Sequence, residues 1–184
     1  PYTDEKSVSN KQALSLYKRW RMRVIESEDH FDTALRLSIA GNIMDYGPGN
    51  NFDVEQTIEQ VMKAKFAIDD SVLLKQRIKE AKSILYLGDN AGEIVFDKLF
   101  IEMLMHHHLT YVVRGAAILN DVTISDAKEV GMDMVADVIT NGYDTSSTIL
   151  DKCSDEFMEA YNNADLIISK GQGNLEGLIN ENDP

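Results

Sequence analysis

The spacing of hydrophobic and polar positions changes about halfway along the chain. As far as Lys82, apolar residues recur three or four positions apart, and no segment alternates in the manner of a strand. This spacing predicts helices at residues 11–27, 29–44, 54–67 and 71–82. We therefore expect residues 1–82 to form an all-helical subdomain.

From Ser83 onward, short apolar runs alternate with helical segments. The runs that read as strands lie at residues 84–87, 109–113, 135–140 and 166–169. Strands that alternate with helices are typical of a parallel sheet with right-handed crossovers. The expected fold class is α/β, with a Rossmann-like parallel sheet and flanking helices in three layers over residues 83–184, attached to the N-terminal helical subdomain.

The first predicted strand ends at an acid and an amide. Asp89 and Asn90 follow it, and helical spacing resumes at Ile94. In open α/β sheets such a junction lies at the carboxyl edge, where ligands bind and a helix N-terminus presents free N–H groups to anions. The same residues would also serve as a helix cap, with Glu93 in the positive first turn. Both interpretations stay open at this point.

Two further clusters follow later strands. Asn120 and Asp121 come after the second strand, and with Asp89 and Asn90 they offer the carboxylate and amide oxygens that Mg²⁺ prefers. The alternative is again a helix cap. Lys170 directly follows the fourth strand, where its ammonium would reach a phosphate held at the metal. The alternative there is an ordinary glycine-rich turn.

Motifs at four places occur in the order of a known family. They are Gly-Asp-Asn-Ala-Gly-Glu at 88–93, Asn-Asp-Val-Thr with Asp126 and Ala127 at 120–127, Lys-Gly-Gln-Gly-Asn at 170–174, and Ala-Gly-Asn-Ile-Met-Asp-Tyr-Gly at 40–47. From about Ser9 to its end the chain resembles the damage-control phosphatase family, long catalogued as a domain of unknown function, and that family's prokaryotic stand-alone branch. The family's paired cysteines near the N-terminus and its further strand after the Lys-Gly motif are absent, so we expect the second domain to be incomplete at its C-terminus.

The resemblance implies a metal-dependent phosphatase acting on small phosphorylated metabolites, such as sugar phosphates or damaged phosphometabolites. It implies a divalent ion, Mg²⁺, Mn²⁺, Co²⁺ or Ni²⁺, held by Asp89, Asn90 and Asp121. The catalytic residues it implies are Asp89, Asp121 and Lys170. The residues expected to bind substrate are Asn42, Asp45, Glu93, Asn120 and Asn174. Of these, Asn174 would hold the phosphate together with Lys170.

Two attacking groups are compatible with such a site, a metal-bound water and a carboxylate. Asp89 is the leading carboxylate. A haloacid-dehalogenase-type reaction needs a second acid two residues after the nucleophile, and Ala91 stands there. The sequence therefore favours the metal-activated water.

Composition narrows the partners and the compartment. Against 31 acidic residues the chain has 18 Lys and Arg, a formal net charge of −13, which disfavours nucleic acid and anionic membranes as partners. The single cysteine, Cys153, excludes an internal disulfide and suits a reducing compartment, so we expect a cytoplasmic protein. No apolar run approaches the ~20 residues that span a bilayer. The oligomeric state stays open.

Two other functions fit parts of the sequence. Residues 84–88 with Gly92 are similar to the first motif of S-adenosylmethionine-dependent methyltransferases, but the turn lacks a Gly-x-Gly pattern and the next strand ends at Arg114, where an acid would hold ribose hydroxyls. A non-catalytic module that binds a metal or a sugar phosphate would use the same residues as the phosphatase. The sequence is therefore compatible with both the phosphatase and the non-catalytic module.

Overall fold

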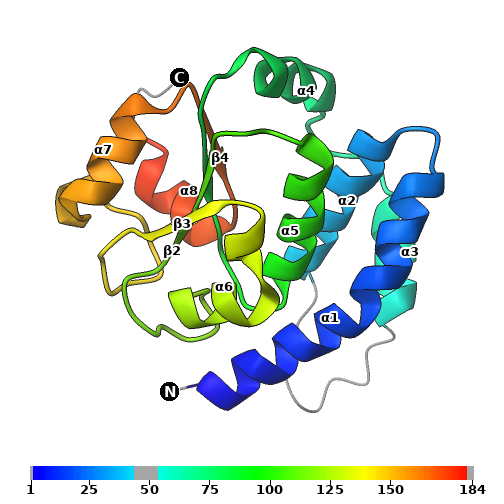
Figure 1. The fold of residues 1–184 in the computed structure, drawn as a ribbon, viewed down its shortest axis with the longest axis horizontal. Coiled ribbons are helices and arrows are strands. Elements are labelled where there is room, and N and C mark those ends of the chain that lie inside the picture. The colour runs from blue at the N-terminus through cyan, green and yellow to red at the C-terminus, as the bar shows by residue number, and fades with distance from the viewer. Residues whose placement is uncertain (1, 44–53, 182–184) are drawn as a thin grey trace.

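A computed structural model describes residues 2–43 and 54–181. At its centre is a four-stranded parallel sheet, with helices on both faces (Figure 1). The strands are β1 (Ile84–Leu87), β2 (Leu109–Val113), β3 (Asp137–Thr140) and β4 (Leu166–Ser169). Their order, β3-β2-β1-β4, is that of the first four strands of the doubly wound order 3-2-1-4-5-6. The predicted α/β fold class is confirmed.

The helices follow the predicted pattern, except that the first begins earlier than expected and the third ends at Lys63 rather than at residue 67. They are α1 (Thr3–Glu26), α2 (His30–Ile43), α3 (Val54–Lys63), α4 (Ser71–Glu80), α5 (Glu93–Leu104), α6 (Ile124–Val130), α7 (Asp155–Asn163) and α8 (Gln172–Leu178). The first helix begins eight residues before the expected Lys11, because its early turns bury polar side chains that an apolar pattern does not reveal. The third strand begins at Asp137 rather than Val135, since a 3-10 turn at Met132–Met134 delays it.

Two hydrophobic clusters lie on opposite faces of the sheet. On one face Ile84 and Tyr86 of β1 pack with residues of α1, α2, α5 and α6. On the other, Leu85 and Leu87 pack with α7, chiefly through Phe157. All four residues of β1 are therefore buried, as a central parallel strand requires. This burial fixes the end of β1, where the first site motif begins.

The helical half shares its core with the sheet half. Trp20 of α1 and Leu37 of α2 belong to the same cluster as Phe96 of α5. The division at residues 82 and 83 stays a prediction, but this shared core places the C-terminal end of α2 beside the carboxyl end of the sheet. Within the described ranges, none of the helices has the length and apolar character needed to cross a membrane.

Candidate functional site

The loops after β1 and β2 are joined directly by backbone hydrogen bonds. Asn90 and Asp121 form an isolated antiparallel bridge. The N–H of Ala91 donates to the carbonyl of Asn120 at 2.8 Å, and that of Val122 donates to the carbonyl of Asp89 at 2.8 Å. This pairing brings the two acid–amide motifs to one place, while the side chain of Asn120 itself is exposed.

Asp89 and Asp121 are buried carboxylates, 9% and 5% exposed. Burial raises the pKa of Asp89, and the charge of Asp121 raises it further against the opposing effect of Arg114. Burial likewise raises the pKa of Asp121, again against Arg114. Two amides also hold Asp89, since Nδ2 of Asn42 and of Asn90 donate to its Oδ2 at 3.0 and 2.6 Å.

Arg114, at the end of β2, is a central residue of the site that sequence reasoning missed. Its guanidinium is 3% exposed, and its Nε donates to Asp121 Oδ2 at 2.9 Å while Nη2 lies 3.9 Å from Asp89 Oδ1. Nη1 donates to the side chains of Thr148 and Asn174, and Nη2 to the carbonyl of Ser146. One cation thus contacts residues that follow each of the four strands, in loops after the first three and, through Asn174, in α8 after the fourth. From the sequence, Arg114 counted only against a ribose-binding acid.

Lys170 lies deeper, in a buried ion network. Its Nζ is 2.7 Å from both Glu93 Oε1 and Asp97 Oδ1, and it also donates to the carbonyl and hydroxyl oxygens of Ser38. Burial lowers the pKa of Lys170, but Asp97 and its other neighbours outweigh this and hold the pKa well above its usual value. The ammonium therefore lies between two buried carboxylates and offsets part of their combined charge. Contact of Lys170 with a phosphate stays a prediction.

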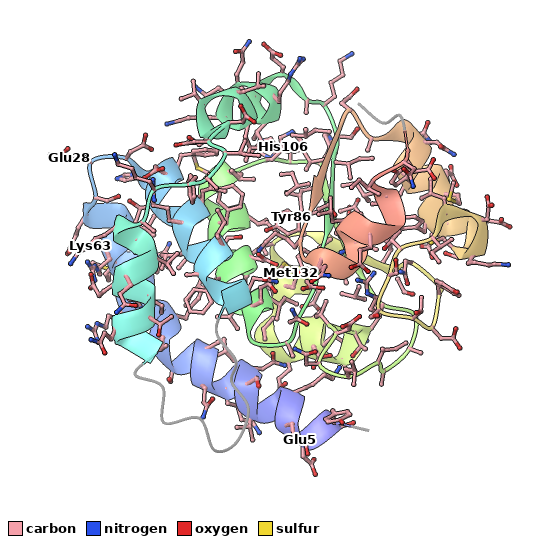
Figure 2. All side chains as sticks on the ribbon, turned by 180° about the vertical axis from the view of Figure 1, so that it is seen from behind. Glu5, Glu28, Lys63, Tyr86, His106 and Met132 are labelled. Carbon is pink, nitrogen blue, oxygen red and sulfur yellow. The ribbon has the colours of Figure 1, made fainter. Side chains whose placement is uncertain are left out.

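Two tyrosines complete this network below the site. Tyr86, near the middle of the molecule in Figure 2, and Tyr111 donate to the two oxygens of Asp97 at 2.7 and 3.0 Å. Burial, reinforced by the charge of Asp97, raises the pKa of both phenols well above the usual range. Both therefore stay protonated as donors to Asp97. Neither Asp97 nor the tyrosines stood out in the sequence, because Tyr86 and Tyr111 look like ordinary core positions and Asp97 looks like a polar residue of a helix.

The glycine-rich turn after β4 packs directly on Asp89. Gly171 has φ +80°, and a Cβ built there would lie 2.1 Å from the carboxylate of Asp89. Asn174 is fully buried, and its Nδ2 donates to the carbonyls of Gly88 and Lys170 at 3.2 and 2.8 Å. Its Oδ1 accepts from Arg114. The turn is thus part of the site's framework, and a direct contact of Asn174 with phosphate stays a prediction.

The structure places the other expected residues as follows. Asn42, at the exposed end of α2, donates to Glu93 Oε2 at 2.9 Å as well as to Asp89. Glu93 is fully buried, and burial raises its pKa against the attraction of Lys170. Asp45 lies outside the described residues.

The donor set fits a hard divalent cation that keeps several waters. Among the described residues no group of three or more His, Cys, Asp and Glu side chains is arranged for a metal. Asp89 and Asp121 supply two carboxylates, and a cation between them would offset the burial that raises their pKa values. Asn90 would present its amide oxygen, exchanging the present hydrogen bond of Nδ2 to Asp89 for a metal contact. The residues present therefore fit the ion that the resemblance implies.

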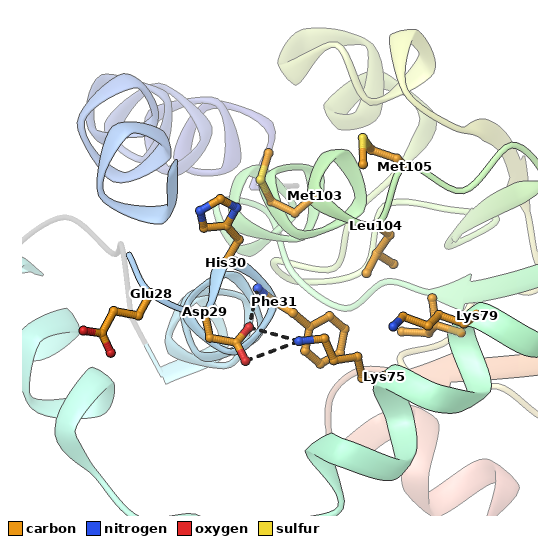
Figure 3. Close-up of a pocket in the computed structure, with 10 residues that line it drawn as sticks. Glu28, Asp29, His30, Phe31, Lys75, Lys79, Met103, Leu104 and Met105 are labelled. Atoms are coloured by element: carbon orange, nitrogen blue, oxygen red, sulfur yellow. Dashed lines mark hydrogen bonds and ion pairs between the residues drawn. The ribbon is translucent and has the colours of Figure 1, made fainter. Parts of the chain in front are cut away.

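A separate cavity of about 470 Å³ lies at the opposite edge of the sheet, between the start of α2, α4 and the end of α5 (Figure 3). Lys75 crosses it and pairs with Asp29 at 3.2 Å. The residues that line it include no member of the predicted site.

The fold and the site together define an open, parallel α/β domain with buried carboxylates at the carboxyl ends of its strands. The sequence profile of the damage-control phosphatase ARMT1-like domain matches residues 1–184. The chain belongs to that family.

Relatives and a solved structure agree with the family. A protein named damage-control phosphatase from Pyrococcus horikoshii is 40% identical over 83% of this chain and 55% of its own length. Another, from Archaeoglobus fulgidus, is 38% identical over 97% of this chain and 64% of its own. An uncharacterised protein from Methanocaldococcus jannaschii is 38% identical over all of this chain and 62% of its own.

The crystal structure of a DUF89 family protein from Pyrococcus horikoshii superposes with a TM-score of 0.90 at 35% identity, covering 100% of this chain and 65% of that one. This match agrees with the order and arrangement of the four strands described above. The chain spans less than two thirds of the length of these relatives.

Proposed function

We propose that this chain forms part of a metal-dependent phosphatase that hydrolyses small phosphorylated metabolites, sugar phosphates or damaged phosphometabolites, in the cytoplasm. The names of two relatives support the phosphatase reaction. The observation that carries the proposal is the pair of buried carboxylates, Asp89 and Asp121, beside the buried guanidinium of Arg114. The strongly acidic composition supports a small-molecule partner rather than nucleic acid or a membrane.

Asp89, Asn90 and Asp121 would hold the divalent ion, Mg²⁺, Mn²⁺, Co²⁺ or Ni²⁺. When bound, such an ion offsets charge on the phosphate and acidifies a coordinated water. Arg114 orients Asp121 through the 2.9 Å bond from Nε, and its remaining donors hold the surrounding loops. Asn42 is positioned to meet the substrate, because it is exposed and already borders Asp89.

Water is the attacking group that this arrangement favours. Asp89 Oδ2 accepts hydrogen bonds from Asn42 and Asn90, and Oδ1 faces Arg114. Both oxygens of Asp89 therefore already have partners, which would have to be exchanged before either oxygen could attack phosphorus. Asp89 is then better suited to hold a cation than to attack phosphorus.

Lys170 contributes chiefly through its charge. Without it, Glu93 and Asp97 would add two buried negative charges directly below the place where a phosphate dianion must bind. By offsetting part of this charge, Lys170 lowers the electrostatic cost of bringing the phosphate in. Asn174 acts alongside it by holding the loop that follows β4.

The proposal is tested with a panel of phosphate esters, each incubated with one of the four metals and again with a chelator. We expect hydrolysis that depends on the metal and is abolished in Asp89→Ala and Asp121→Ala, whereas the exposed control Asp29→Ala keeps full activity. Absence of hydrolysis above background with every metal would overturn the phosphatase reaction. If the metal still bound without turnover, the non-catalytic module would be the better description.

A further inference from the structure

The first turns of α1 bury two polar side chains against the loops that carry the metal candidates. Lys6 is 3% exposed and Asn10 is fully buried. Burying an ammonium and an amide is costly unless each polar atom finds a partner. The partners of these two side chains lie more than 80 residues away in the chain.

Each side chain bonds the backbone of one ligand-bearing loop. Lys6 Nζ donates to the carbonyl oxygen of Asp121 at 3.0 Å. Asn10 Oδ1 accepts the N–H of Gly92, the residue that precedes α5, at 2.7 Å. Asp121 and Gly92 belong to the two loops that the Asn90–Asp121 bridge joins. Helix α1 therefore ties both loops to one rigid element.

A third residue locks the two side chains together. Asp126 of α6 pairs with Lys6 through Oδ2 and accepts from Asn10 Nδ2 at 3.2 Å through Oδ1. The same carboxylate accepts the N–H of Thr123 at 2.9 Å and so caps α6. The charge of Lys6 is thus compensated where it is buried, which lets the ammonium remain beside Asp121.

We propose that Lys6 and Asn10 are positioning residues that order the loops after β1 and β2 and hold the metal ligands at their spacing. The inference rests on the proposed metal site. Asp89, Asn90 and Asp121 stand on loops rather than within strands, so their geometry depends on what holds the backbone around them. Outer contacts of this kind typically change metal affinity by about 10–100-fold when removed.

The first test measures binding of Mn²⁺ by the loss of its free-ion electron paramagnetic resonance signal. Asn10→Ala and Lys6→Met are each expected to raise the dissociation constant about tenfold. The matched control is Ser7→Ala, which removes a contact from α1 to Glu129 of α6 without touching either loop. The control is expected to bind as the wild type does. Equal affinity in all four proteins, or an equal loss in Ser7→Ala, would overturn the proposal.

The second test needs no metal. In the presence of a chelator, backbone amides of residues 88–93 and 120–123 are expected to exchange with deuterium about tenfold faster in Asn10→Ala and Lys6→Met, while β1 keeps its protection. Unchanged exchange in the loops would overturn the positioning role, and faster exchange throughout β1 would show a general loss of stability instead. A wild type that binds no Mn²⁺ would count against the proposed function, whereas the exchange result would still decide the role of α1.

Discussion

Replacement of Arg114 by methionine tests the idea that one buried cation organises the site. Methionine keeps the unbranched apolar stem but is shorter than arginine and removes every hydrogen bond of the guanidinium. It leaves the carboxylate of Asp121 without the cation at 2.9 Å, and it leaves Asn174 Oδ1 and the Ser146 carbonyl without these donors.

The expected cost follows from the burial of the pair. The side chains of Arg114 and Asp121 are 3% and 7% exposed, so solvent does not replace the lost partner. Removing one partner of a buried ion pair costs about 3–5 kcal/mol. For a domain of this size, each kcal/mol lowers the melting temperature by about 2–4 °C, so the variant should melt about 6–20 °C lower.

Urea unfolding in a chelator, followed by circular dichroism, measures the free energy directly. The control is Lys75→Met, whose ion pair with Asp29 is 40% and 54% exposed and should contribute no more than about 1 kcal/mol. Loss of Arg114 also raises the pKa of Asp121 further, so the defect should shrink as the pH falls and Asp121 is protonated. A loss below about 1 kcal/mol, equal to that of the control, would refute the reasoning.

Three further predictions follow from the same geometry. Gly171→Ala puts a Cβ 2.1 Å from the carboxylate of Asp89 at φ +80°, so we expect weaker Mn²⁺ binding in titrations and a lower melting temperature; wild-type values in both would contradict the close approach. Lys170→Met leaves Glu93 and Asp97 without their buried cation and should lower the unfolding free energy by about 3–5 kcal/mol in urea; an unchanged midpoint would show that the network is not coupled. Burial and Asp121 raise the pKa of Asp89, so its stabilising contribution to the metal-free protein is present at acid pH and is lost as the pH rises through that pKa. The unfolding free energy of Asp89→Asn, measured relative to the wild type, should therefore be more favourable at pH 8 than at pH 4. A difference between the two proteins that does not change with pH would contradict this sign.

The sheet was predictable because its signal is local. Each strand is a short apolar run. In three of the four, such as Ile84–Leu87, the strand begins and ends at the predicted residues. The start of α1 was not predictable in this way, since Lys6 and Asn10 are polar and yet buried. Their partners, Asp126 and Gly92, are far away in sequence, so no periodicity reports the burial.

The candidate site was predictable only in its acids and amides. Asp89 and Asp121 stand at strand ends, and the expectation that these ends meet needs only a parallel sheet. The role of Arg114 depends on acceptors from the loops after β3 and β4, which no spacing near residue 114 announces. Thr148 illustrates the limit, because its hydrogen bonds to Arg114 and Asn174 join residues that are far apart in the sequence.

The hydrogen bonds of Arg114 also limit how the lengths of the surrounding loops can differ between members of the family. Because one guanidinium takes its acceptors from separate loops, an insertion at 146–148 or 171–174 would displace an acceptor from a fixed donor. By contrast, residues 116–119 lie at the partly exposed rim between β2 and Asp121. Insertions and deletions that adapt the pocket to new substrates are thus expected to accumulate at 116–119. The lengths of segments 146–148 and 171–174 are expected to change only together.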